Sequence, residues 1–99
     1  MKVKSRTALE ARAASIFNEL HGKYPLSGIM YVIGKVMQIQ SLAMIGRDTQ
    51  MFFPGELDQC ASQIYEIHEG YKPCEITYIL GTMTKLQSLA MLQDAEAGA

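Results

Sequence analysis

The sequence predicts an all-α protein in which two tandem αα-hairpin repeats pack as a pseudo-twofold four-helix bundle. Apolar residues recur at helical spacing, no segment combines strict alternation with turn signals, and one half of the chain repeats the other. The 99 residues have room for one domain, which we take as residues 1–99. A composition of 48% hydrophobic and 19% charged residues is ordinary for a globular protein.

The internal repeat is the most specific signal in the sequence. Residues 13–46 align with residues 60–93 at an offset of 47 without gaps, and 13 of the 34 pairs are identical. The longest identical run is Gln-Ser-Leu-Ala-Met, at residues 40–44 and 87–91. Because self-similarity at a fixed offset marks a duplicated structural unit, we expect the two halves to fold alike.

The first repeat is predicted to contain two helices. Thr7 and Glu10 have the spacing of a capping box, in which the hydroxyl and the carboxylate bind free backbone N–H groups. The first helix should end near Gly22. The second should cover about residues 26–46 and lead into a linker at 47–53. Their predicted buried faces are formed by Leu9, Ala13, Ile16, Phe17 and Leu20, and by Ile29, Val32, Ile33, Val36 and Ala43.

The second repeat follows the same plan. Its first helix should begin near residues 54–56, since Pro54 is tolerated at the first helical position, and end at Gly70. The last helix should cover about residues 73–94, followed by a tail, about 94–99, that we expect to fray. The predicted buried faces are formed by Leu57, Cys60, Ala61, Ile64 and Ile67, and by Ile76, Ile79, Leu80, Met83 and Ala90.

Two pairs of matched residues interrupt these apolar helices. Gln40 and Gln87 lie in the middle of the buried faces, where an amide needs hydrogen-bond partners. We interpret them as a structural polar pair across the pseudo-axis that fixes register; the alternative is a polar handle in a ligand cavity. Gly34 and Gly81 cost helix stability, so their presence in both repeats predicts the close approach of another backbone, with a kink as the competing explanation.

Charge and hydropathy exclude several classes of partner. Nine basic against ten acidic residues lack the basic excess typical of nucleic-acid binding, so we expect no nucleic acid. Residues 24–46 carry one charge, but Lys35, Gln38 and Gln40 fall in mid-span, so we predict a buried helix and no membrane partner. Glu10 and Arg12 interrupt any secretory signal, and we expect a cytoplasmic protein.

No motif for catalysis, metal binding or cofactor binding is present, so we predict a protein that is not an enzyme and carries no metal or cofactor. His21 and His68 match in the repeat but lack the spacing of zinc ligands. We expect each to lie near a helix C-terminus, where a charged imidazole interacts favourably with the helix dipole. Cys60 and Cys74 are predicted to be reduced, buried small residues.

A stripe of methionines is the best candidate for a binding surface. Met30, Met37, Met44 and Met51 are spaced by seven residues, and Phe52 and Phe53 follow directly. The second repeat has Thr77 and Thr84 where the first has Met30 and Met37, so the core does not require methionine there. We therefore predict a regulatory, adaptor or inhibitor protein that binds a protein partner or itself as a homodimer through these residues. The competing explanation is that the first helix or the linker covers the stripe.

Two other functions stay open as alternatives. Residues 75–81 are similar to the start of a DNA-binding helix-turn-helix, and several polar side chains follow Gly81. However, Gln87 occupies the place where that motif has an apolar residue, and a continuous helix explains both repeats. The second alternative is a binder of a small apolar ligand between the helices.

Overall fold

The computed structural model describes residues 4–47 and 55–98, and within them the protein is entirely helical, with no strand. The predicted all-α class is confirmed. The four helices are α1 (Arg6–His21), α2 (Leu26–Met44), α3 (Glu56–Glu66) and α4 (Pro73–Ala97).

The start of α1 differs from the prediction. Ser5 is the N-cap residue, and its Oγ accepts a hydrogen bond of 3.2 Å from the backbone N–H of Ala8. The capping box that we predicted for Thr7 and Glu10 is therefore wrong, because the helix begins earlier and Thr7 already lies inside its first turn. Serine is as good a cap as threonine, so the local spacing alone does not distinguish the two starts.

The matched helices α2 and α4 end differently. Gly46 has φ 75°, and the N–H groups of Gly46 and Arg47 donate to the carbonyls of Ala43 and Leu42 at 3.1 and 2.9 Å. This glycine-dependent arrangement ends α2. The matched residue in the second repeat is Gln93, and α4 continues past it. The tail expected to fray from residue 94 is thus helical as far as Ala97.

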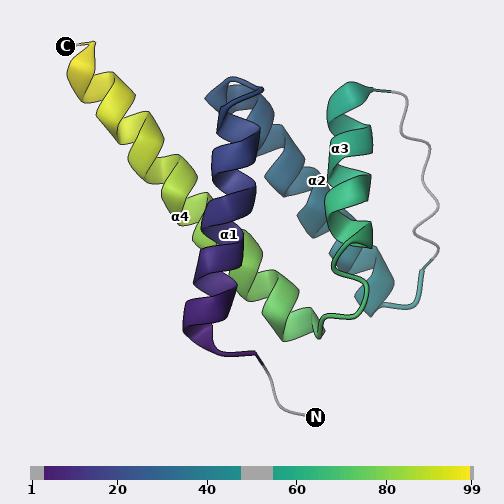
Figure 1. Cartoon of the computed structure of the whole chain (residues 1–99). Helices are drawn as coiled ribbons and strands as arrows, with labels where there is room; N and C mark the ends of the chain where they lie inside the picture. Colours follow the sequence, from purple (N-terminus) through teal and green to yellow (C-terminus); the bar gives the residue numbers. More distant parts are fainter. Residues whose placement is uncertain (1–3, 48–54, 99) are drawn as a thin grey trace.

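The main packing partners of each helix lie in the other repeat. α2 and α4 cross in the middle of the molecule, α1 lies against α4, and α3 lies against α2 (Figure 1). The packing is that of a bundle, but each repeat contributes its first helix to the other repeat's second helix. The expectation of two locally packed αα-hairpins is wrong in this respect, because α1 contacts α2 only slightly and α3 makes no comparable contact with α4 over the described residues.

The predicted core is largely confirmed. All five residues named for α1 are buried, as are four of the five named for α2 and four of the five for α4; Ala43 and Ala90 are partly exposed. Ala61 and Ile64 of α3 are buried, whereas Leu57 and Cys60 are partly so. Ile67 was predicted to be buried and is 57% exposed. The reason is that α3 ends at Glu66, so Ile67 no longer continues its apolar face.

Gly34 and Gly81 do not accommodate a neighbouring backbone. A Cβ atom built on either residue meets nothing within 4 Å, and both residues are exposed. The predicted close approach within the chain is therefore wrong. Neither helix is interrupted at its glycine, since α2 and α4 each run through it.

Candidate interaction surfaces

The outer side of α2 carries a row of exposed apolar side chains. Met30, Met37 and Met44 are 50, 46 and 63% exposed, so the structure leaves all three open to solvent. At 100° per residue they share one side of the helix with smaller or apolar exposed residues. We call this surface the methionine face; it consists of Met30, Gly34, Met37, Ser41, Met44 and Ile45.

The matched side of α4 has threonines in its first half, although Met91 and Leu92 follow in the places of Met44 and Ile45. Thr84 donates its hydroxyl to the carbonyl of Leu80 at 2.8 Å, and the Thr77 hydroxyl accepts a hydrogen bond from Gln40. Met30 and Met37 replace these threonines in the first repeat. Methionine is thus not required by the helix crossing. The other predicted binding residues, Met51, Phe52 and Phe53, lie outside the described residues.

Gln40 and Gln87 are buried where α2 and α4 cross. The Gln40 amide nitrogen donates to the carbonyl of Pro73 at 2.9 Å and to Thr77 Oγ1 at 2.8 Å. The Gln87 amide nitrogen donates to the carbonyl of Leu26 at 2.6 Å. The amides therefore do not donate to each other, as a direct pair would require. Each instead bonds to the first residue of the opposite helix, and Leu26 and Pro73 are themselves matched by the 47-residue offset.

The two amides are not equally satisfied. Gln87 Oε1 is buried without a hydrogen-bond partner, the one side-chain polar atom of the described chain in that state. Its nitrogen has only the Met91 sulfur, at 3.7 Å, as a second contact. The residue matched to Thr77 is Met30, which offers no hydroxyl. Because Met30 stands where the other repeat has Thr77, Gln87 has fewer hydrogen-bond partners than Gln40.

His68 lies in a buried polar contact between α1 and the turn before α4. Its Nε2 accepts a hydrogen bond of 3.1 Å from Arg12 Nε, which leaves Nδ1 as the donor to the carbonyl of Ile64 at 2.7 Å. Burial of the ring, together with the positive charge of Arg12, lowers the pKa of His68. The predicted position near a helix C-terminus is confirmed, since α3 ends at Glu66. The predicted charged imidazole is wrong for His68, because this geometry requires the neutral ring. His21 is exposed at the end of α1.

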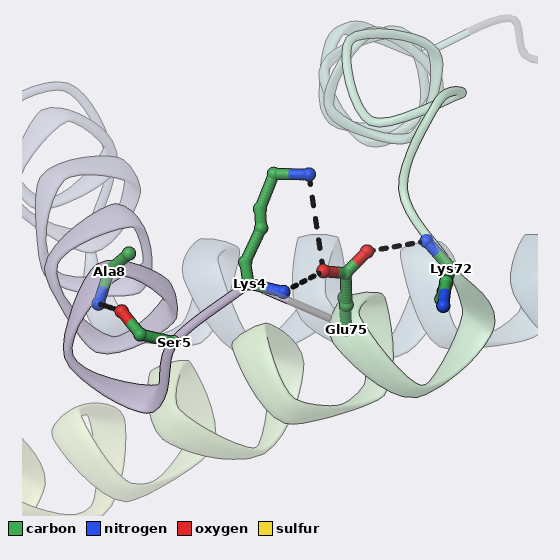
Figure 2. Close-up of polar contacts among 5 residues, drawn as sticks. All are labelled: Lys4, Ser5, Ala8, Lys72 and Glu75. Atoms are coloured by element: carbon green, nitrogen blue, oxygen red, sulfur yellow. Dashed lines mark hydrogen bonds and ion pairs between the residues drawn. The ribbon is translucent and has the colours of Figure 1, made fainter. Parts of the chain in front are cut away.

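Glu75 anchors the beginning of the described chain to α4 (Figure 2). Its buried carboxylate accepts hydrogen bonds of 2.7 Å from the backbone N–H groups of Lys4 and Lys72. Lys4 Nζ lies 3.9 Å from the same carboxylate and 4.0 Å from the centre of the Tyr71 ring. The two backbone donors lower the pKa of Glu75, so the ionised carboxylate is the form that holds this corner together. Sequence reasoning missed Glu75, because its partner Lys4 is 71 positions away.

Two matched tyrosines connect the packed helix pairs. Tyr31 of α2 donates its hydroxyl to Asp58 of α3 at 2.5 Å, and Tyr78 of α4 donates to Glu10 of α1 at 2.9 Å. Lys35 adds an ion pair of 3.8 Å to Asp58. Both tyrosines therefore join the second helix of one repeat to the first helix of the other.

A cleft of about 370 Å³ separates α1 from α3. Apolar side chains from both helices line it, among them Ile16, Leu20 and Ile64, and charged residues such as Glu19 and Glu56 also contribute. Neither Gln40 nor Gln87 lines this cleft, so the predicted polar handle for a ligand is not part of it. Burial raises the pKa of the Cys60 thiol at its edge, which disfavours the reactive thiolate.

The remaining chemical candidates are not gathered into a site. No three His, Cys, Asp or Glu residues of segments 4–47 and 55–98 are placed to hold a metal ion. Cys74, predicted to be buried, is exposed. α4 is continuous from Pro73 to Ala97, so the helix-turn-helix resemblance at 75–81 lies within one unbroken helix.

Comparisons with protein-family models, with curated proteins and with solved structures give no match for this chain. None of the helices in the described segments has both the length and the apolar character needed to cross a membrane. The exposed surfaces of the described chain are therefore the basis for a functional proposal.

Proposed function

We propose that this protein acts by protein–protein interaction, as a regulatory, adaptor or inhibitor protein that associates with itself or with a protein partner through the methionine face. The observation that carries the proposal is that Met30, Met37 and Met44 lie exposed in a row although the matched helix has threonine at two of these positions. Methionine is flexible and polarisable, and exposed rows of it are typical of adaptable protein-binding surfaces.

The centre of the face also favours close contact with another molecule. Gly34 lies between Met30 and Met37, and a Cβ atom there would meet nothing in this chain. Glycine in mid-helix lowers helix stability by about 1 kcal/mol relative to alanine. The absence of a side chain at this exposed position leaves room for the close approach of a second protein.

The pseudo-twofold arrangement of the two repeats belongs to the same proposal. Its support is the exchange of hydrogen bonds between matched residues, from Gln40 to Pro73 and from Gln87 to Leu26. Matched positions of α2 and α4 are also buried alike, at 29 and 76, 32 and 79, 33 and 80, and 36 and 83. In this arrangement the two halves differ on the methionine face at Met30 and Met37, which match threonines.

The test replaces methionines with the residues of the sister repeat. A chain carrying both Met30→Thr and Met37→Thr should keep its helical circular dichroism and its melting temperature, because both side chains are about half exposed. Its self-association, followed by sedimentation velocity over a concentration series, should weaken about thirtyfold, as expected for the loss of an interface anchor of about 2 kcal/mol. A separate Phe52→Ala variant tests whether the predicted surface extends beyond residue 47.

Ile67→Thr provides the matched control. Ile67 is as exposed as the methionines but lies at the end of α3, outside the methionine face. This variant should associate like the unmodified chain. The proposal is wrong if the double threonine variant unfolds at markedly lower temperature while association is unchanged, because the methionines would then belong to the core.

A further inference from the structure

Within the described residues, three of the five large exposed apolar side chains outside the methionine face lie near the end of α4. Leu89, Met91 and Leu92 are 47, 44 and 56% exposed. They belong to residues 88–97, which we call the α4 arm; Figure 1 shows this yellow end extending past α1. Seven of the nine large apolar residues that are exposed in the described chain lie on the arm or on the methionine face. The apolar surface is thus confined mainly to two patches.

The arm and the far end of the methionine face cannot meet within one molecule. Gln87, directly before the arm, bonds to Leu26 at the start of α2, whereas Gln40, near the end of α2, bonds to Pro73 at the start of α4. The two helices therefore cross in opposite directions, and their C-terminal ends lie on opposite sides of the molecule (Figure 1). Contact between these two ends requires a second molecule.

The charges of the two patches are complementary. Asp94 and Glu96 follow the apolar residues of the arm, and the last turn of α4 contains no basic residue. Carboxylates are disfavoured at a helix C-terminus, where they meet the negative end of the dipole, and a cation nearby relieves this repulsion. The methionine face ends next to the exposed Arg47, which follows Ile45 and the terminating Gly46.

We infer that the α4 arm of one copy docks on the methionine face of a second copy. Leu89 and Leu92 pack against the methionines near Ser41, and Asp94 and Glu96 lie beside Arg47. This inference rests on the proposed function and names its partner as the same chain. Because the two surfaces differ, each molecule has one surface of each kind to offer.

A mixing experiment tests this assignment. The face variant carries Met30→Thr and Met37→Thr and keeps the arm; the arm variant carries Leu89→Ser and Leu92→Ser and keeps the face. Each should remain folded, since all four side chains are about half exposed, and each alone should associate about thirtyfold more weakly than the unmodified chain. Mixed together, they should form a one-to-one heterodimer, identified by its mass in native mass spectrometry.

The outcomes separate this inference from the proposed function. If the arm variant associates like the unmodified chain while the face variant does not, the arm is not the partner, but the methionine face remains the binding surface. If both variants are monomeric and the mixture forms no heterodimer, arm-to-face docking is overturned. If the face variant associates normally, or the unmodified chain is monomeric at every accessible concentration, self-association through this face is itself overturned.

Charge reversal gives an independent readout. Arg47→Glu, and separately Asp94→Lys with Glu96→Lys, should each weaken self-association about threefold to tenfold, with a smaller effect at high salt. The chain that combines all three substitutions should recover much of the loss. Additive weakening in the combined chain would contradict the pairing of the arm with Arg47.

Discussion

α2 and α4 bury matched positions but differ at particular positions of their exposed sides. Five matched pairs, from Ile29 and Ile76 to Gln40 and Gln87, are buried in both helices. On the exposed side, Met30 and Met37 of α2 correspond to threonines in α4, whereas Met44 corresponds to a methionine. The glycine that ends α2 corresponds to a glutamine through which α4 continues. The helix crossing thus constrains one side of each helix and leaves the other free to differ.

The C-terminal ends of α1 and α3 have matched residues in different environments. Their matched histidines have the same identity but different environments, since His21 is exposed and His68 is buried against Arg12. A residue shared by both repeats therefore does not imply a shared role. Substitution of matched residues in pairs measures how far the two halves differ.

The largest difference is expected between the two histidines. His68→Ala removes a buried ring and two hydrogen bonds, and should lower the free energy of unfolding by about 2–3 kcal/mol. His21→Ala should change it by no more than about 0.5 kcal/mol, because the ring is exposed. Urea denaturation at about pH 8, where His68 is neutral, measures both values. Equal costs would mean that the halves do not differ at this position.

The same pair predicts a pH dependence. Burial holds the pKa of His68 below its usual value of 6.5, so the unfolded chain binds more protons as the pH falls through 6.5. The stabilising contribution of neutral His68 is therefore complete above that pH and lost below it. The unmodified chain and His21→Gln should lose stability between about pH 7.5 and about pH 5.5, whereas His68→Gln should show a flatter profile. This range lies above the titration of Glu75, whose lowered pKa moves its own loss of stability below 4.5.

An intermediate difference is expected at the helix crossing. Gln40→Leu removes two hydrogen bonds and should cost about 1–2 kcal/mol of unfolding free energy. Gln87→Leu should cost less than about 0.5 kcal/mol, because it also removes a buried oxygen that has no partner. Denaturation midpoints of the two variants, measured side by side, decide the order. A larger cost for Gln87→Leu would contradict the unequal hydrogen bonding of the two amides.

The smallest effects are expected at the two exposed glycines. Gly34→Ala and Gly81→Ala should each raise the free energy of unfolding by about 0.5–1 kcal/mol, since helix propensity improves and the new methyl group meets nothing. Only Gly34→Ala should weaken self-association, because Gly81 lies outside the methionine face. Thermal melts at low concentration and sedimentation at high concentration separate the two effects. A loss of stability in either variant would show that its helix surface is covered within the monomer.

The sequence by itself determined the four helices and most of the core, because helical periodicity is a local property of the chain. It also determined that Met30, Met37 and Met44 share one side of a helix and that Gln40 and Gln87 are matched. The helices and the shared side of the methionines depend on residues within a few turns of one another, which is the distance over which a 3.6-residue period acts. The match of Gln40 with Gln87 depends instead on the 47-residue offset of the repeat.

Which helices pack together, and which matched residues share an environment, depends on the tertiary structure. The burial of His68 against Arg12 and the contact of Glu75 with Lys4 join residues 56 and 71 positions apart. The packing of α1 on α4 and of α3 on α2 likewise joins helices of different repeats. Such contacts leave no local pattern, because the orientation of one helix on another depends on the whole buried surface. For the same reason, the exposure of the methionine face became visible only when the positions of α3 and α4 beside α2 were known.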